Sequence, residues 1–132
     1  MVIARRLNVV DSSAWLAYLA DDATAAQFAE AIEDTENLVV PAICILEVFK
    51  VVTKQRGEAD AMQAAAVMLQ GTVVDLDATL ALSAARIGLA RRLPLADSVV
   101  YATAQQAGAM LWTQDDDFSG LPDVRYVPKS AR

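Results

Sequence analysis

Five short apolar runs, the first four separated by pairs of longer segments with helical character, constrain the fold of this 132-residue chain most strongly. Strands that alternate with helices of ten or more residues join through right-handed crossovers, and the resulting parallel sheet is covered by helices on both faces. The sequence therefore predicts an α/β fold with a mainly parallel central sheet of about five strands flanked by helices. The predicted strands are residues 7–10, 38–41, 72–76, 109–113 and 124–127.

The predicted helices differ in how clearly the sequence marks them. Segment 42–54 is rich in β-branched residues, which favour a strand, but its length and its late lysines favour a buried helix, and we predict a helix. Pro94 breaks the helical pattern and separates the last two helices. The predicted helices are residues 14–20, 23–33, 42–54, 58–69, 78–92 and 97–107.

Length and composition are those of one intracellular domain. The chain is 55% hydrophobic, enough to bury one core, and it contains no internal repeat or linker, so we expect a single domain over residues 1–132. Its only cysteine, Cys44, cannot form an internal disulfide. The first apolar run is interrupted by Asn8 and ended by Asp11, and elsewhere no run reaches about 18 apolar residues. We expect a cytoplasmic protein without a membrane partner.

The absence of histidine excludes several kinds of catalysis. The chain has no histidine, so it can form neither a Ser-His-Asp triad nor a histidine zinc site. It also lacks both glycine-rich nucleotide-binding motifs. Acidic residues outnumber basic ones by 17 to 11, so the overall charge does not attract nucleic acid. Hydrolytic chemistry in this chain must therefore use carboxylates, hydroxyls, lysines or a metal bound by oxygen.

Four acidic positions are expected to meet at one edge of the sheet. Asp11 follows the first predicted strand and Asp115 follows the fourth. The carboxyl ends of parallel strands share one edge, where α/β proteins form their sites. Asp97 and Glu47, on helices that start at or pass this edge, are expected to join them.

Each of these acids also has a structural interpretation. Asp11 and Asp97 could be helix N-caps, Glu47 could pair with Lys50 on its own helix, and the run 115–117 could be a solvated loop. Two carboxylates about 5 Å apart repel by roughly 3 kcal/mol at an effective dielectric of about 20. Hard oxygen ligands suit Mg²⁺ or Mn²⁺, which would offset that repulsion. The residues alone thus favour metal-assisted phosphodiester hydrolysis.

Four segments of the chain contain these acids: V-V-D-S-S-A-W-L (9–16), I-C-I-L-E-V (43–48), L-P-L-A-D-S-V-V-Y-A-T-A (93–104) and L-W-T-Q-D-D-D-F (111–118). Together and in register, they resemble the PIN domain of the VapC toxin family. The resemblance spans nearly the whole chain in the family's order. It implies a magnesium-dependent endoribonuclease, a hydrolase that is the toxin of a toxin–antitoxin pair.

The resemblance also implies roles for particular residues. Asp11 and Asp97 match the aspartates that share the metal, and Glu47 and Asp115 match the other two catalytic acids. The supporting positions are one hydroxyl beside the first aspartate and two residues of the T-x-D-x-D-F motif: Ser13, Thr113 and Asp117.

Neighbouring positions carry weaker expectations. Asp116 falls at the variable position of that motif and is expected to be exposed. Trp112 is predicted to fill the core rather than to stack on a base.

The resemblance implies three partners: RNA as substrate, a cognate antitoxin and a second copy of the chain in a homodimer. Cationic side chains that could contact RNA phosphates are Lys50, Lys54, Arg86, Arg91 and Arg92, although each is also compatible with a solvated helix face. Two alternatives stay open from the sequence. One is a PIN-like module that binds without catalysis, and the other is a phospho-acceptor receiver domain.

Overall fold

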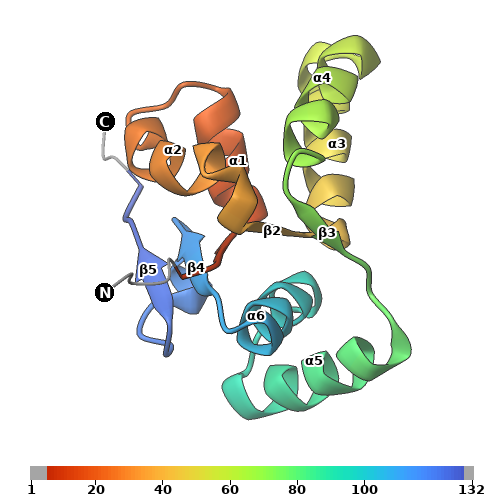
Figure 1. The fold of residues 1–132 in the computed structure, drawn as a ribbon, viewed down its shortest axis with the longest axis vertical. Helices are drawn as coiled ribbons and strands as arrows, with labels where there is room; N and C mark the ends of the chain where they lie inside the picture. Colours follow the sequence, from red (N-terminus) through yellow and green to blue (C-terminus); the bar gives the residue numbers. More distant parts are fainter. Residues whose placement is uncertain (1–5, 130–132) are drawn as a thin grey trace.

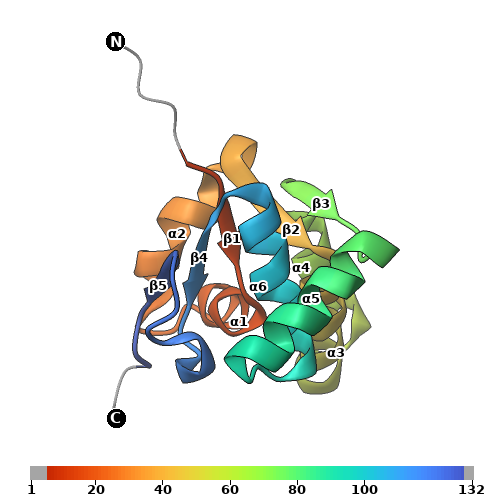
Figure 2. The same cartoon turned by 90° about the horizontal axis from the view of Figure 1, so that it is seen from below.

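A five-stranded parallel sheet forms the centre of the computed structural model, which describes residues 6–129 (Figures 1 and 2). The predicted domain limits, residues 1 and 132, lie outside this range. The strands follow the order β3-β2-β1-β4-β5, and every neighbouring pair is parallel, so all five carboxyl ends share one edge. The strands are β1 (Asn8–Val10), β2 (Leu38–Pro41), β3 (Thr72–Val74), β4 (Met110–Thr113) and β5 (Val124–Tyr126).

The strand order decides one of the alternatives. Receiver domains have the flavodoxin-like order 2-1-3-4-5. This chain instead places β1 at the centre, between β2 and β4. The receiver interpretation is therefore wrong.

Helices cover both faces of the sheet, which confirms the predicted α/β fold. In Figure 1, α1 and α2 lie above the sheet, α5 and α6 lie below it, and α3 pairs with α4 beside β2 and β3. The segment with ambiguous propensity is a helix, as predicted. No helix within residues 6–129 is long and apolar enough to span a membrane. The helices are α1 (Ser12–Leu19), α2 (Ala25–Glu33), α3 (Ala42–Arg56), α4 (Glu58–Met68), α5 (Ala78–Arg91) and α6 (Leu95–Ala107), with 3-10 helices η1 (Thr35–Asn37) and η2 (Asp116–Phe118).

Burial of both sheet faces explains why the strands read as continuous apolar runs. Val9 and Val10 on the central strand point to opposite faces, and both are fully buried. Trp15 of α1 and Phe28 of α2 are also fully buried and belong to the same core. These buried side chains pack α1 and α2 against the sheet.

Helix α6 begins two residues earlier than the sequence predicts. Pro94 lies at the N-cap position, with a φ of −56°, where its missing N–H breaks no hydrogen bond of the helix. Ser98 Oγ then donates to the Pro94 carbonyl at 2.8 Å. A Cβ on Gly88 would lie 2.5 Å from Ser98 Oγ, so glycine allows α5 to approach this turn closely. Asp97 is consequently a first-turn residue and not the N-cap.

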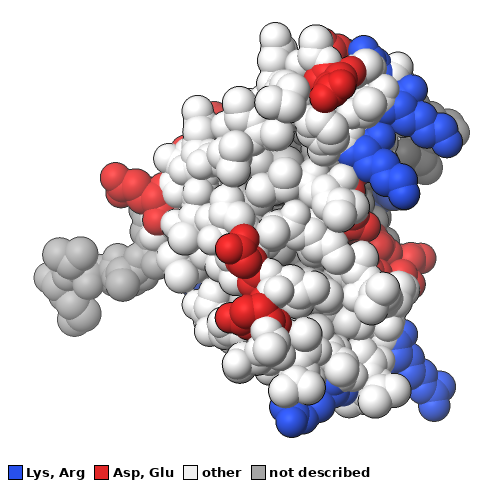
Figure 3. Space-filling model, turned by 90° about the vertical axis from the view of Figure 1, so that its right-hand side faces the viewer, with Lys and Arg blue, Asp and Glu red and all other residues white. Residues whose placement is uncertain are grey.

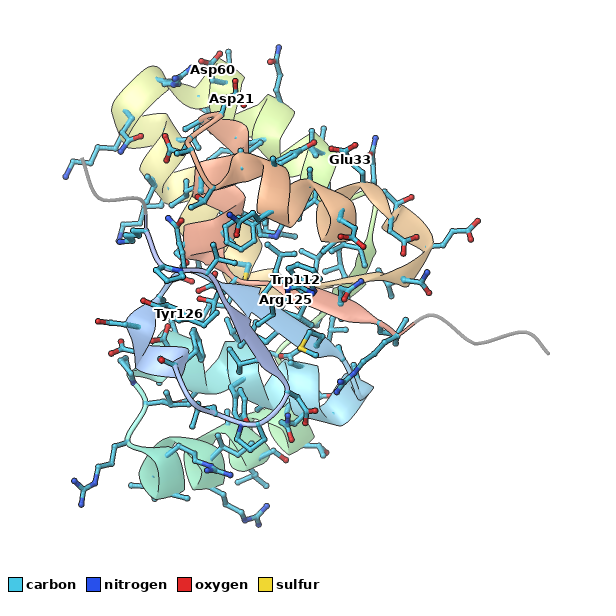
Figure 4. The ribbon with its side chains drawn as sticks, turned by 90° about the vertical axis from the view of Figure 1, so that its left-hand side faces the viewer. Asp21, Glu33, Asp60, Trp112, Arg125 and Tyr126 are labelled. Carbon is cyan, nitrogen blue, oxygen red and sulfur yellow. The ribbon has the colours of Figure 1, made fainter. Side chains whose placement is uncertain are left out.

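Trp112 fills the core between β1 and β5. Its exposed fraction is 7%, and its indole N–H donates to Asn8 Oδ1 at 2.8 Å. Arg125 covers the ring, with its guanidinium carbon 4.7 Å from the ring centroid (Figure 4). The prediction of a core role for Trp112 is therefore confirmed.

Candidate active site

Asp11 lies where β1 ends and α1 begins. Its Oδ1 accepts hydrogen bonds from Ser13 Oγ at 2.8 Å and from the Ala14 N–H at 3.1 Å, so it is an N-cap. Its Oδ2 accepts from Thr113 Oγ1 at 2.9 Å. Burial raises the pKa of Asp11 to about 6; the three hydrogen bonds oppose this rise, and nearby Asp115 adds to it. Asp11 can therefore be both the N-cap of α1 and a member of the acidic site.

Thr113 joins the ends of two neighbouring strands. Besides donating to Asp11, its hydroxyl accepts the Asp115 N–H at 2.9 Å. Asp115 in turn caps η2, because its Oδ1 accepts the Asp117 N–H at 2.9 Å. Phe118 is fully buried and anchors this turn to the core.

Three carboxylates meet beside this turn. Asp97, Asp115 and Asp117 each offer one carboxylate oxygen, and these oxygens all lie within 4.8 Å of one another. Burial raises the pKa of Asp97 most, and the neighbouring carboxylates Asp115, Asp117 and Asp11 add to the rise, so that the pKa is about 7. Asp116, between two members of the group, is exposed as predicted.

Glu47 approaches Asp11 from α3 through a serine. Its Oε1 accepts a hydrogen bond from Ser12 Oγ at 2.7 Å, and no ion pair joins it to Lys50 within residues 6–129. The Cys44 thiol is fully buried nearby, and burial together with the charges of Asp11 and Glu47 raises its pKa. Cys44 is thus an inert core residue next to two of the acids.

The structure does not place all the predicted site residues equally close together. Asp97, Asp115 and Asp117 form the tight group, Asp11 interacts electrostatically with Asp97 and Asp115, and Glu47 contacts the Asp11 segment through Ser12. Sequence reasoning gave Asp117 only a supporting role and gave Ser12 none. The spacing of the T-x-D-x-D-F motif could have indicated Asp117, but no sequence pattern indicates a bond between residues 35 positions apart.

The donor set fits a hard divalent cation. Every group in the tight cluster is a carboxylate oxygen, and Asp11 keeps lone pairs beyond those used by its three donors. Burial first, and then the neighbouring carboxylates, raise the pKa of Asp97, so a charged Asp97 among these groups carries a free-energy cost. A cation bound among them would remove that cost.

The PIN domain profile matches residues 9–124 of this chain, a range that includes every predicted site residue. The chain belongs to the PIN domain family. No curated protein is significantly similar to it in sequence.

Several solved structures of similar fold are toxins or toxin–antitoxin complexes. A toxin–antitoxin complex from Klebsiella pneumoniae is 22% identical, with a TM-score of 0.75, over 89% of this chain and 95% of that one. VapC20 of Mycobacterium tuberculosis, a toxin that cleaves the sarcin–ricin loop, is 25% identical, with a TM-score of 0.72. The match covers 89% of this chain and 98% of VapC20. VapBC2 from Rickettsia felis, bound to promoter DNA, is 12% identical, with a TM-score of 0.71. The match covers 92% of this chain and 98% of that one.

Proposed function

We propose that this PIN domain is a metal-dependent endoribonuclease and the toxin of a toxin–antitoxin pair. The observation that carries the proposal is the group of three aspartate carboxylates within 4.8 Å, beside the buried Asp11, at the carboxyl edge of a PIN fold. The similarity to a toxin that cleaves an RNA loop supports RNA as the substrate class.

The four proposed catalytic acids are Asp11, Glu47, Asp97 and Asp115. Asp11 and Asp97 are proposed to hold Mg²⁺, with Mn²⁺ as the alternative, and the position of Asp117 supports adding it to the ligands. When bound, such a cation lowers the pKa of a water and neutralises charge on the leaving oxygen.

Three hydroxyl groups orient the proposed acids. Ser13 and Thr113 donate to different oxygens of Asp11 and so fix the plane of its carboxylate. Ser12 fixes Glu47 in the same way from α1. Such partners commonly change metal affinity or activity about 10- to 100-fold when removed.

Similarity to VapBC complexes supports a cognate antitoxin as the partner, and the cytoplasm as the compartment where both would act. A homodimer is also proposed.

Cleavage of RNA by purified protein tests the proposal. We expect the wild-type protein to cleave RNA in Mg²⁺ and not in EDTA. The Asp11→Asn variant should not cleave RNA even in Mg²⁺. Expression should arrest growth, and coexpression with the small protein encoded alongside should relieve the arrest. RNA binding without cleavage in any metal would instead support the non-catalytic binding module.

A further inference from the structure

Two cationic groups lie on opposite sides of the acidic site. Figure 3 shows Asp and Glu side chains at the right-hand margin of the molecule, with Lys or Arg side chains above and below them. The upper part of this view contains α3 and α4, and the lower part contains α5. This arrangement is unexpected from composition, because the chain has a net charge of −6.

Two lysines lie on the same helix as Glu47. Lys50 and Lys54 follow Glu47 by three and seven residues on α3, so all three share one face of the helix. At 1.5 Å per residue, this face extends about 10 Å from Glu47 to Lys54. Both lysines are exposed, and within residues 6–129 neither ammonium group is paired with a carboxylate.

Two arginines lie in the turn that leads to Asp97. Arg91 is the last residue of α5, and Arg92 caps it in the left-handed conformation with a φ of 56°. They precede Asp97 by six and five residues. Both are exposed, and neither guanidinium is paired with a carboxylate within the described residues.

We propose that an RNA strand crosses the acidic site from α3 to the α5–α6 turn, with phosphates on one side of the scissile bond held by Lys50 and Lys54 and those on the other side held by Arg91 and Arg92. The inference rests on the proposed nuclease function and adds the path of the substrate to it. Unpaired cations on both sides of a carboxylate cluster suit a polyanion that must approach the cluster without being repelled by it. Phosphate contacts of this kind position a strand without reading its sequence.

The test is the salt dependence of RNA binding in an Asp97→Asn background, which we expect to bind RNA without cutting it. The probe is a fluorescein-labelled single-stranded RNA, with Mg²⁺ fixed and KCl varied. Removing one cation that binds a phosphate makes the slope of log K against log[salt] shallower by about 0.7 for single strands. Lys50→Gln, Lys54→Gln, Arg91→Gln and Arg92→Gln should each show this decrease, and the decrease should be the same for RNAs of different sequence.

Arg6→Gln is the charge-matched control. Arg6 precedes β1 at the amino edge of the sheet and pairs with Asp123 at 2.8 Å, so its removal should leave the slope unchanged. Unchanged slopes in all four variants, or no RNA binding by the parent at low salt, would overturn the inference. Unchanged slopes in variants that lose affinity for a coexpressed protein would assign these cations to that partner instead. Cleavage by the wild type, measured separately, shows whether the proposed function itself holds.

Discussion

Thr113 donates its hydroxyl proton to Oδ2 of the buried Asp11 at 2.9 Å, and this bond joins the carboxyl ends of β4 and β1. The same hydroxyl accepts the Asp115 N–H, so one side chain sets the positions of two proposed acids. The parallel strands bring Asp11 and Asp115 to the same edge of the sheet, and the Thr113 hydroxyl then fixes the orientation of the Asp11 carboxylate and the position of the Asp115 backbone.

Thr113→Val should destabilise the protein. Valine keeps the volume but leaves a carboxylate oxygen of Asp11, which is 4% exposed, without its donor. A buried group left unsatisfied costs about 1–3 kcal/mol, so urea denaturation should show a decrease of that size in the free energy of unfolding. Thr113→Ser, which keeps the hydroxyl, should be destabilised less. Equal stability of the valine variant and the wild type would contradict the role assigned to this bond.

Asp97→Asn should stabilise the metal-free protein. Burial and three neighbouring carboxylates raise the pKa of Asp97 to about 7, so the charged form is unfavourable in the folded state. We expect the Tm in EDTA at pH 8 to rise, on the order of 5 °C, and the further rise on adding Mg²⁺ to shrink. Asp116→Asn removes an exposed charge next to the cluster and should change neither value. A lower Tm for Asp97→Asn would show that these carboxylates do not repel one another.

The stability of the metal-free protein should fall as pH rises from about 4 to 8. The pKa values of Asp11 and Asp97, about 6 and about 7, lie above the usual 3.8, so the folded state holds protons that the unfolded state releases. The two raised pKa values therefore add to the free energy of unfolding. This stabilisation is fully present below about pH 4 and is lost as the pH rises through 6 and 7. Thermal unfolding in EDTA across this pH range measures this loss. The Tm difference between Asp97→Asn and the wild type should grow with pH. A difference that does not vary with pH would contradict the assigned pKa shift.

Ser12→Ala should reduce RNA cleavage while leaving the fold intact. The variant removes the donor to Glu47 Oε1 at 2.7 Å, and we expect activity to fall about 10-fold. The free energy of unfolding should change by only about 1 kcal/mol, because the bond is partly exposed. Ser12→Thr, which keeps the hydroxyl, should restore most of the rate. Full activity of the alanine variant would show that the hydrogen bond from Ser12 does not position Glu47 for catalysis.

The sequence predicts the fold better than it predicts the geometry of the site. Alternation of apolar runs and helices was enough for the parallel sheet, because burial of both faces leaves a pattern in every strand. The common carboxyl edge then located Asp11 and Asp115. The early start of α6 was missed, because the sequence rule used Pro94 as a break and not as the helix start.

The finer contacts depend on side chains from distant segments. Ser12 and Glu47 are 35 positions apart, and no local pattern links them. The three consecutive aspartates differ for a related reason. The short helix η2, anchored by Phe118, turns Asp115 and Asp117 toward Asp97 and leaves Asp116 in solvent. A run of like charge therefore contains two proposed site residues, of which Asp117 is itself exposed, and one exposed neighbour outside the group.

The most direct test of the carboxylate site compares these three aspartates. Initial rates of RNA cleavage are measured in Mg²⁺ for Asp115→Asn, Asp116→Asn and Asp117→Asn, with folding checked by circular dichroism. We expect the rates of the Asp115→Asn and Asp117→Asn variants to fall by at least about 10-fold, because metal binding is weakened, while Asp116→Asn cuts at the wild-type rate. Wild-type rates for Asp115→Asn and Asp117→Asn, or an equal decrease in all three variants, would contradict this expectation.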